Sequence, residues 1–168
     1  MNKTVKDILS YVIIIGVALL IKFFVFSPIR VNGTSMYPTL LDGDLMILNE
    51  IGYRINGVKR FDIVVINSNG EKIIKRVIGL PGEKIEYKDN KLYVNDELVE
   101  ENFEHAKTKD FNLSEVKLEK IPENHYFVLG DNRVNSKDSR IIGAIDKKQI
   151  IGKTSFTFFP FSRIGSKR

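Results

Sequence analysis

The sequence predicts a mainly β protein: an antiparallel, partly barrel-like domain that follows one N-terminal transmembrane helix. Three observations lead to this fold class. A long apolar run lies near the N-terminus, short apolar segments separated by turn residues fill most of the remaining 168-residue chain, and one long polar loop interrupts them. Serial short strands with a single long loop are typical of an antiparallel β domain.

The apolar run extends from Ile8 to Phe26. Its 19 residues would form a helix about 28 Å long, close to the hydrocarbon thickness of a bilayer. Its one charged residue, Lys22, lies near the end, where the ammonium can reach the interface. A run apolar on every face fits lipid better than a buried core helix. Because the sequence Ser27–Arg30 is a poor site for signal cleavage, we expect an uncleaved anchor.

The residues that flank this run predict its orientation. Lys3 and Lys6 precede it, with only Asp7 against them, and positive flanks stay on the cytoplasmic side. We therefore expect residues 1–7 to be a cytoplasmic tail and residues 8–26 to cross the cell membrane once. Residues 27–168 would then form an extracytoplasmic domain on the outer face.

Turn residues divide this outer portion into expected strands. Pro81-Gly82 suits a type II turn, and Lys88-Asp89-Asn90 suits a hairpin between two alternating segments. The polar stretch 100–123 is expected to be a loop with a short helix near residues 112–118. The aromatic tail Phe156–Phe161 is expected to pack in the core as part of a terminal strand. The expected strands are Leu45–Leu48, Phe61–Ile66, Lys72–Leu80, Lys84–Tyr87, Lys91–Val94, Tyr126–Leu129 and Ile150–Phe159.

Composition excludes several kinds of site. The chain contains no cysteine, so it has no disulfide, thiol nucleophile or thiolate metal site. Its net charge of +5 comes from lysines spread among acids, which favours a basic face toward anionic lipid and not a nucleic-acid partner. The only histidines, His105 and His125, lack a second histidine or carboxylate at metal spacing. We assign both to the surface, which leaves a Ser-His-Asp arrangement without its histidine and predicts no metal or cofactor.

A serine nucleophile can instead transfer its proton to a neutral lysine. Ser35 lies in a turn-like segment just after the apolar run, and Lys75 lies in a strand-like run with Ile73 and Val77 on its own face. Desolvation there would lower the lysine pKa from about 10.4. The residues alone leave alternatives open: Ser35 in an ordinary turn, and Lys75 paired with an acid or reaching solvent at a sheet edge.

A third segment, Gly130–Arg140, is dense in residues that form turns and bond to the backbone. If Ser136 to Arg140 is extended, then Ser136, Asp138 and Arg140 point the same way, and Asp138 can pair with Arg140. The alternative is a well-solvated surface turn.

Three segments together resemble the motifs of bacterial type I signal peptidases: Ser35–Thr39, Lys75–Glu83 and Gly130–Arg140. The short, single-span Gram-positive form is the most similar, and the resemblance extends from the anchor to Phe161. It implies a serine-lysine endopeptidase on an antiparallel β fold outside the cytoplasmic membrane. Such an enzyme cuts signal peptides from exported preproteins, usually after small residues at the −1 and −3 positions.

The resemblance also implies roles for individual residues. Ser35 would be the nucleophile and its N–H an oxyanion donor, Lys75 would be the general base, and Ser136 would orient the lysine. Asp138 and Arg140 would hold the loop behind them, and Met36 would border the site. Preproteins, membrane lipid and the secretion translocon are the implied partners, with no cofactor.

One position departs from the family pattern. Some members have a serine as a second oxyanion donor where this chain has Gly33, so a backbone group or the Thr34 hydroxyl would have to replace it. Two rival functions stay open. Self-cleaving repressors share the serine-lysine chemistry but would carry a DNA-binding segment in place of the apolar run, and a membrane-anchored binding module would not need both Ser35 and Lys75.

Overall fold

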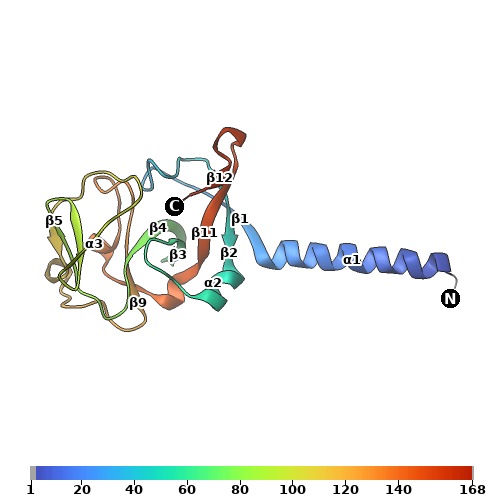
Figure 1. Ribbon diagram of the computed structural model, residues 1–168, viewed down its shortest axis with the longest axis horizontal. Helices are drawn as coiled ribbons and strands as arrows, with labels where there is room; N and C mark the ends of the chain where they lie inside the picture. Colours follow the sequence, from blue (N-terminus) through green and yellow to red (C-terminus); the bar gives the residue numbers. More distant parts are fainter. Residues whose placement is uncertain (1–2, 168) are drawn as a thin grey trace.

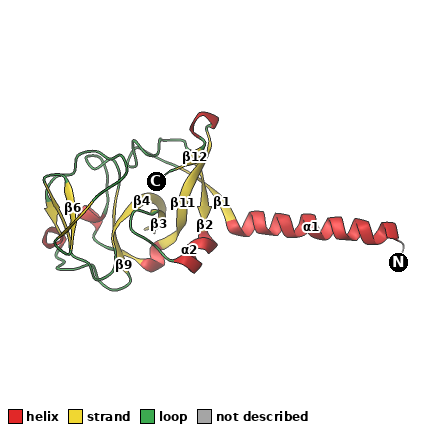
Figure 2. Ribbon diagram, viewed as in Figure 1, coloured by secondary structure: helices red, strands yellow, loops and turns green. Residues whose placement is uncertain are grey.

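The computed structural model describes residues 3–167, and a long N-terminal helix, α1 (Lys3–Val25), projects from a body of antiparallel strands (Figures 1 and 2). In the part of the chain that is described, none of the helices combines the length and apolar character needed to cross a bilayer. The expected span 8–26 lies partly outside the described residues, since the side chains of residues 18–26 are not among them. The same holds for the first two residues of the expected tail.

The larger sheet has eight strands, all paired antiparallel. Its order is β1-β2-β11-β3-β4-β9-β10, with β12 paired to β11. Among the strands that are described, this ladder does not close on itself, so the sheet is open and not a closed barrel. The strands are β1 (Phe26–Arg30), β2 (Leu45–Asn49), β3 (Ile63–Ser68), β4 (Glu71–Gly79), β9 (His125–Leu129), β10 (Ile145–Asp146), β11 (Ile150–Phe159) and β12 (Gly165–Ser166).

The smaller sheet has the order β7-β6-β5-β8 and contains β5 (Ile85–Lys88), β6 (Lys91–Val94), β7 (Glu97–Val99) and β8 (Phe111–Asn112). The expected hairpin is confirmed, with Lys88 opposite Lys91. Asp89 and Asn90 both have positive φ, as a two-residue hairpin turn requires. A core cluster that includes Ile85 and Leu92 of this sheet and Ile78 and Phe127 of the larger one joins the two.

Short helices connect the strands: α2 (Glu50–Asn56), α3 (Ser139–Ile142) and the 3-10 turns η1 (Leu113–Val116), η2 (Lys147–Gln149) and η3 (Phe161–Arg163). The turn η1 confirms the short helix expected near residues 112–118, and Asn112 and Glu115 form a capping box at its start. The aromatic tail differs from expectation. Phe156 and Phe159 are exposed although they belong to β11, where the buried residue of this end is Thr157. Phe161, which is 78% exposed, lies beyond the strand in η3.

Candidate active site

The turn that carries Ser35 follows β1 and is held by its buried neighbours. Met36 and Leu40 are fully buried in a cluster with Ile74 of β4. At the start of the turn, Val31 and Gly43 are joined by a backbone hydrogen bond of 2.9 Å. Gly33 has φ +83°, in the left-handed region that favours glycine, and its N–H donates to Oδ1 of Asp42 over 2.7 Å. A glycine at this position is therefore required by the backbone.

Lys75 reaches this turn from the middle of β4, where it lies opposite Val64 of β3. Its Nζ lies 2.7 Å from Oγ of Ser35 and donates a second hydrogen bond of 3.0 Å to the carbonyl oxygen of Ile74. The residue is only 3% exposed. The structure thus brings together the two residues, 40 positions apart, that the sequence singled out.

Burial changes the acidity of this amine. Desolvation lowers the pKa of Lys75 from 10.5 to about 8, although the carboxylates of Asp138 and Asp131 act to raise it. The amine is therefore partly neutral in the mildly alkaline range. A neutral amine has a lone pair that can accept the Ser35 hydroxyl proton across the 2.7 Å contact.

In the segment Gly130–Arg140, Asp138 and Arg140 form the expected ion pair, but not through an extended backbone. Arg140 donates to both carboxylate oxygens of Asp138, over 2.9 Å from Nε and 2.8 Å from Nη2. The stretch is not extended through Arg140, because Asp138 is the N-cap of α3 and accepts from the Arg140 backbone N–H. Asp138 also accepts from the Gly130 N–H over 3.1 Å, so it ties the two ends of the loop together.

Ser136 does not make the expected hydrogen bond to Lys75. Its hydroxyl oxygen is buried and has no hydrogen-bond partner among the described residues, and the second Lys75 bond goes to the Ile74 carbonyl. The hydroxyl lies close to the nucleophile turn nevertheless. A Cβ at Gly130 would lie 2.3 Å from both the Ser136 Oγ and the Ser35 carbonyl oxygen, so only glycine allows this approach.

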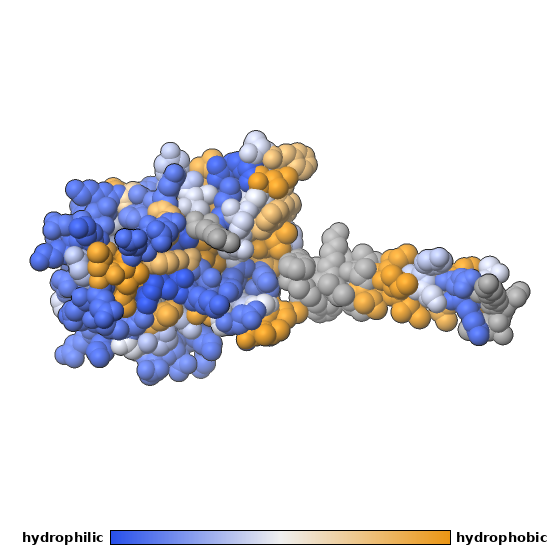
Figure 3. Space-filling view, viewed as in Figure 1, coloured by the Kyte–Doolittle hydropathy of each residue, from blue (hydrophilic) through white to orange (hydrophobic). Residues whose placement is uncertain are grey.

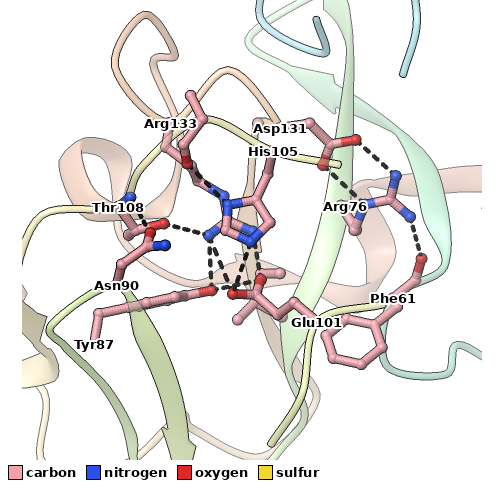
Figure 4. Close-up of polar contacts among 12 residues, drawn as sticks. Phe61, Arg76, Tyr87, Asn90, Glu101, His105, Thr108, Asp131 and Arg133 are labelled. Carbon is pink, nitrogen blue, oxygen red and sulfur yellow. Dashed lines mark hydrogen bonds and ion pairs between the residues drawn. The ribbon is translucent and has the colours of Figure 1, made fainter. Parts of the chain in front are cut away.

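The sequence reasoning missed a buried ion pair between Arg76 and Asp131 (Figure 4), which also contacts the Ser35 segment. Arg76 donates to both carboxylate oxygens of Asp131, over 2.8 and 2.6 Å, and Thr39 donates to the same carboxylate. Arg76 directly follows Lys75, and Thr39 lies four residues after Ser35. The sequence did contain a signal for this pair: Arg76 lies within an apolar strand, and a buried guanidinium needs a buried acid as its partner.

Asn132 was missed as well, and it contacts the nucleophile turn directly. Its backbone N–H donates to the Ser35 carbonyl oxygen over 3.0 Å, and its Nδ2 donates to the Thr34 carbonyl oxygen over 3.1 Å. The position of the Ser35 backbone is therefore set partly by the Gly130–Ser136 loop.

The surface assignment of His105 is wrong. Its side chain is 11% exposed, packs against the Phe103 ring and lies 3.5 Å from the Glu101 carboxylate. The segment between β7 and β8 that contains it is irregular, but Glu101, Phe103 and His105 are less exposed than Asn102 and Glu104, which lie between them. His125 is partly exposed at the start of β9, with Nδ1 2.9 Å from the Glu123 carbonyl oxygen.

Comparison with known proteins places this chain in a family. Residues 4–159 match the family model described as signal peptidase, peptidase S26. The chain belongs to this signal peptidase family. It is 42% identical to signal peptidase IB of Staphylococcus aureus (strain COL) over 176 residues, which cover 94% of this chain and 92% of that protein.

Further relatives agree. The chain is 43% identical to signal peptidase I T of Bacillus subtilis (strain 168) over 164 residues, covering 92% of this chain and 85% of that protein. A crystal structure of a signal peptidase I from Enterococcus faecalis V583 is 38% identical and superposes with a TM-score of 0.53, covering 57% of this chain and 95% of that one. The similarities confirm a type I signal peptidase, an enzyme that removes signal peptides.

Proposed function

We propose that this signal peptidase cleaves exported preproteins with Ser35 as nucleophile and Lys75 as general base, while anchored in the membrane. The observation that carries the proposal is the 2.7 Å contact between the Lys75 Nζ and the Ser35 Oγ. The contact joins a hydroxyl to a buried amine whose pKa is lowered to about 8. This combination suits proton abstraction by lysine.

Acyl transfer proceeds in two halves. Neutral Lys75 accepts the Ser35 hydroxyl proton as Oγ attacks the scissile carbonyl, and the resulting ammonium gives that proton to the leaving amine of the mature protein. The signal peptide is then held as an ester on Ser35. Water attacks this ester, Lys75 accepts the water proton, and the proton returns to Oγ as the signal peptide leaves.

Two donors are proposed for the oxyanion. The Ser35 backbone N–H is one. The Gly33 N–H is bonded to Asp42, so it does not serve as the second. The Thr34 hydroxyl is the better candidate, because its oxygen accepts from Asn135 Nδ2 at 3.4 Å and its own proton can then turn toward the oxyanion.

Met36 and Ser136 are proposed to support the site. Met36 follows Ser35 and is buried in one cluster with Ile29 and Ile74, so it supports the nucleophile turn at the border of the site from inside the protein. Ser136 has a buried hydroxyl beside the Ser35 carbonyl. We propose that it accepts a hydrogen bond from the Lys75 ammonium when that charge forms during attack. Asp138 and Arg140 hold this loop in place.

We also propose that residues 8–26 anchor the enzyme in the cell membrane, with residues 1–7 in the cytoplasm and residues 27–168 on the outer face. In support, α1 projects away from the body (Figure 1), and its described side chains Ile8, Leu9 and Val12–Ile15 are exposed. The body has apolar surface on the side from which α1 projects (Figure 3). The exposed Phe159, Phe161 and Ile164 suit contact with lipid. The translocon stays a prediction from the resemblance.

The test is cleavage of a preprotein by the purified full-length protein in detergent. Ser35→Ala and Lys75→Ala are each expected to abolish processing, and the double variant should be no worse than either single one. Lys75→Arg should be as inactive as Lys75→Ala, since a guanidinium stays charged at any working pH. Turnover by Lys75→Ala at the wild-type rate would refute the assignment of Lys75 as the general base.

A further inference from the structure

The loop formed by residues 130–136, called the dyad loop below, contacts the backbone of Ser35 and helps to set its position. Asn132 holds the Ser35 carbonyl oxygen over 3.0 Å, and Gly130 packs against the same oxygen. On one side, Asp131 fixes the loop to Arg76, the residue after Lys75. A shift of Asn132 in this loop would therefore move the Ser35 backbone relative to Lys75.

On its other side, the dyad loop is fastened to the smaller sheet through Arg133 (Figure 4). The Arg133 side chain is fully buried, and its Nη1 donates to Oγ1 of Thr108 over 2.6 Å and to the Tyr87 hydroxyl over 3.1 Å. Its Nη2 donates to the Glu101 carboxylate, which is 5% exposed. Tyr87 of β5 in turn donates to Glu101 over 2.9 Å.

Glu101 is the acid that balances the buried Arg133 charge. Asp131, the other nearby carboxylate, already accepts two bonds from Arg76. The Phe103 ring lies near both guanidinium groups, with its centroid 3.9 Å from that of Arg76 and 5.9 Å from that of Arg133. A buried guanidinium without its acid has to move or admit water. Either change would displace the dyad loop.

We propose that Glu101 is a positioning residue, which acts through Arg133 to hold the dyad loop in the place that sets the contact between Ser35 and Lys75. Glu101 touches neither residue of the dyad, and it lies in a loop outside the three family motifs. The inference rests on the proposed roles of Ser35 and Lys75.

The test compares two variants of the full-length enzyme in detergent, with a preprotein substrate. Glu101→Gln removes the buried charge and keeps the shape, while Glu100→Gln makes the same change at the exposed neighbouring residue. For Glu101→Gln we expect kcat to fall about 10- to 100-fold with KM nearly unchanged, as for a small misplacement of reacting groups. The acidic limb of its pH–rate profile should move to higher pH, because water admitted near Lys75 reduces the desolvation of the amine. Glu100→Gln should match wild type in both respects.

A purely structural role would lower the melting temperature of Glu101→Gln but leave kcat and the acidic limb as in Glu100→Gln, and that result would overturn the proposal. Thr108→Val is the second variant in case Glu101→Gln does not fold, since it removes one bond to Arg133 and keeps the ion pair. It should lower kcat in the same direction by a smaller factor, and an unchanged kcat would also overturn the proposal. Ser35→Ala in the same assay distinguishes failure of the Glu101 proposal from failure of the proposed function. Activity in that variant would refute the roles of Ser35 and Lys75 themselves.

Discussion

Replacing Lys75 by methionine should abolish activity and also remove a pH-dependent part of the stability. Methionine fills nearly the same volume as the lysine stem but carries no charge. With 1.36 kcal/mol per pKa unit, the fall in the Lys75 pKa from 10.5 to about 8 means that the buried ammonium destabilises the wild type by about 3 kcal/mol at neutral pH. The variant is free of this penalty. It loses the hydrogen bond to the Ile74 carbonyl, however, which costs about 1–3 kcal/mol.

Because these two contributions nearly offset at pH 7, the change with pH is the decisive quantity. The unfolded lysine keeps its proton up to about 10.5, but the folded one loses it near 8. Between these values the unfolded state binds more protons, so the free energy of unfolding of the wild type rises with pH. Below pH 8 and above 10.5 this contribution is constant. Lys75→Met lacks it, so the stability of the wild type relative to the variant should rise by about 3 kcal/mol across the window.

Urea denaturation at several pH values between 7 and 10.5 measures this difference. The chain has no tryptophan, so far-UV circular dichroism is the suitable signal. Lys91→Met is the matched control, because Lys91 is exposed in the β5–β6 hairpin. Parallel stability curves for wild type and Lys75→Met would show that the pKa of Lys75 is not lowered, and the argument for a neutral base would fail.

Three more outcomes are expected. The kcat/KM of the wild type should rise with pH through about 8, the pKa of Lys75, and a flat profile between pH 6 and 9 would contradict a lysine base. Thr34→Val should lower kcat by about 100-fold if its hydroxyl is the second oxyanion donor, whereas an unchanged kcat would exclude that role. Deletion of residues 1–25 should leave cleavage of short soluble peptides measurable but reduce processing of a preprotein in liposomes, because shared anchoring raises the effective concentration. Equal rates for the full-length and truncated enzymes in liposomes would mean that the helix serves only for localisation.

The local pattern of apolar segments and turn residues was sufficient to predict the longer strands of the fold. The strands β2, β4, β9 and β11 were expected close to their observed bounds, because each is an apolar segment that ends at turn residues. Strand β1 was not expected. It continues directly from the apolar run, contains Pro28, and forms an edge of the sheet, the position that tolerates proline. Strands β8 and β10 have two residues each and no readable period.

The same limit applies to the site. Ser35 and Lys75 could be found because each lies in a distinctive local segment, and the resemblance joined them. The partner of a buried charge is a matter of long-range packing, and Arg76 and Asp131 are 55 residues apart. The inward turn of His105 depends on Phe103 and Glu101, in a loop whose polar sequence has no hydrophobic period. For such residues, the sequence showed the composition of the loop but not which side chains would be buried.

Two arginine contacts, the expected one of Arg140 and the missed one of Arg76, also bear on how Lys75 keeps a low pKa. The carboxylates that act to raise it are those of Asp138 and Asp131. Arg140 binds both oxygens of the first, and Arg76 binds both oxygens of the second. Each carboxylate is therefore already balanced by a guanidinium that cannot be deprotonated, and its attraction for a proton on Lys75 is reduced. Desolvation then dominates. The arrangement lets the enzyme keep two acids beside its base, where they fix the loop by hydrogen bonds, without holding the base in its charged form.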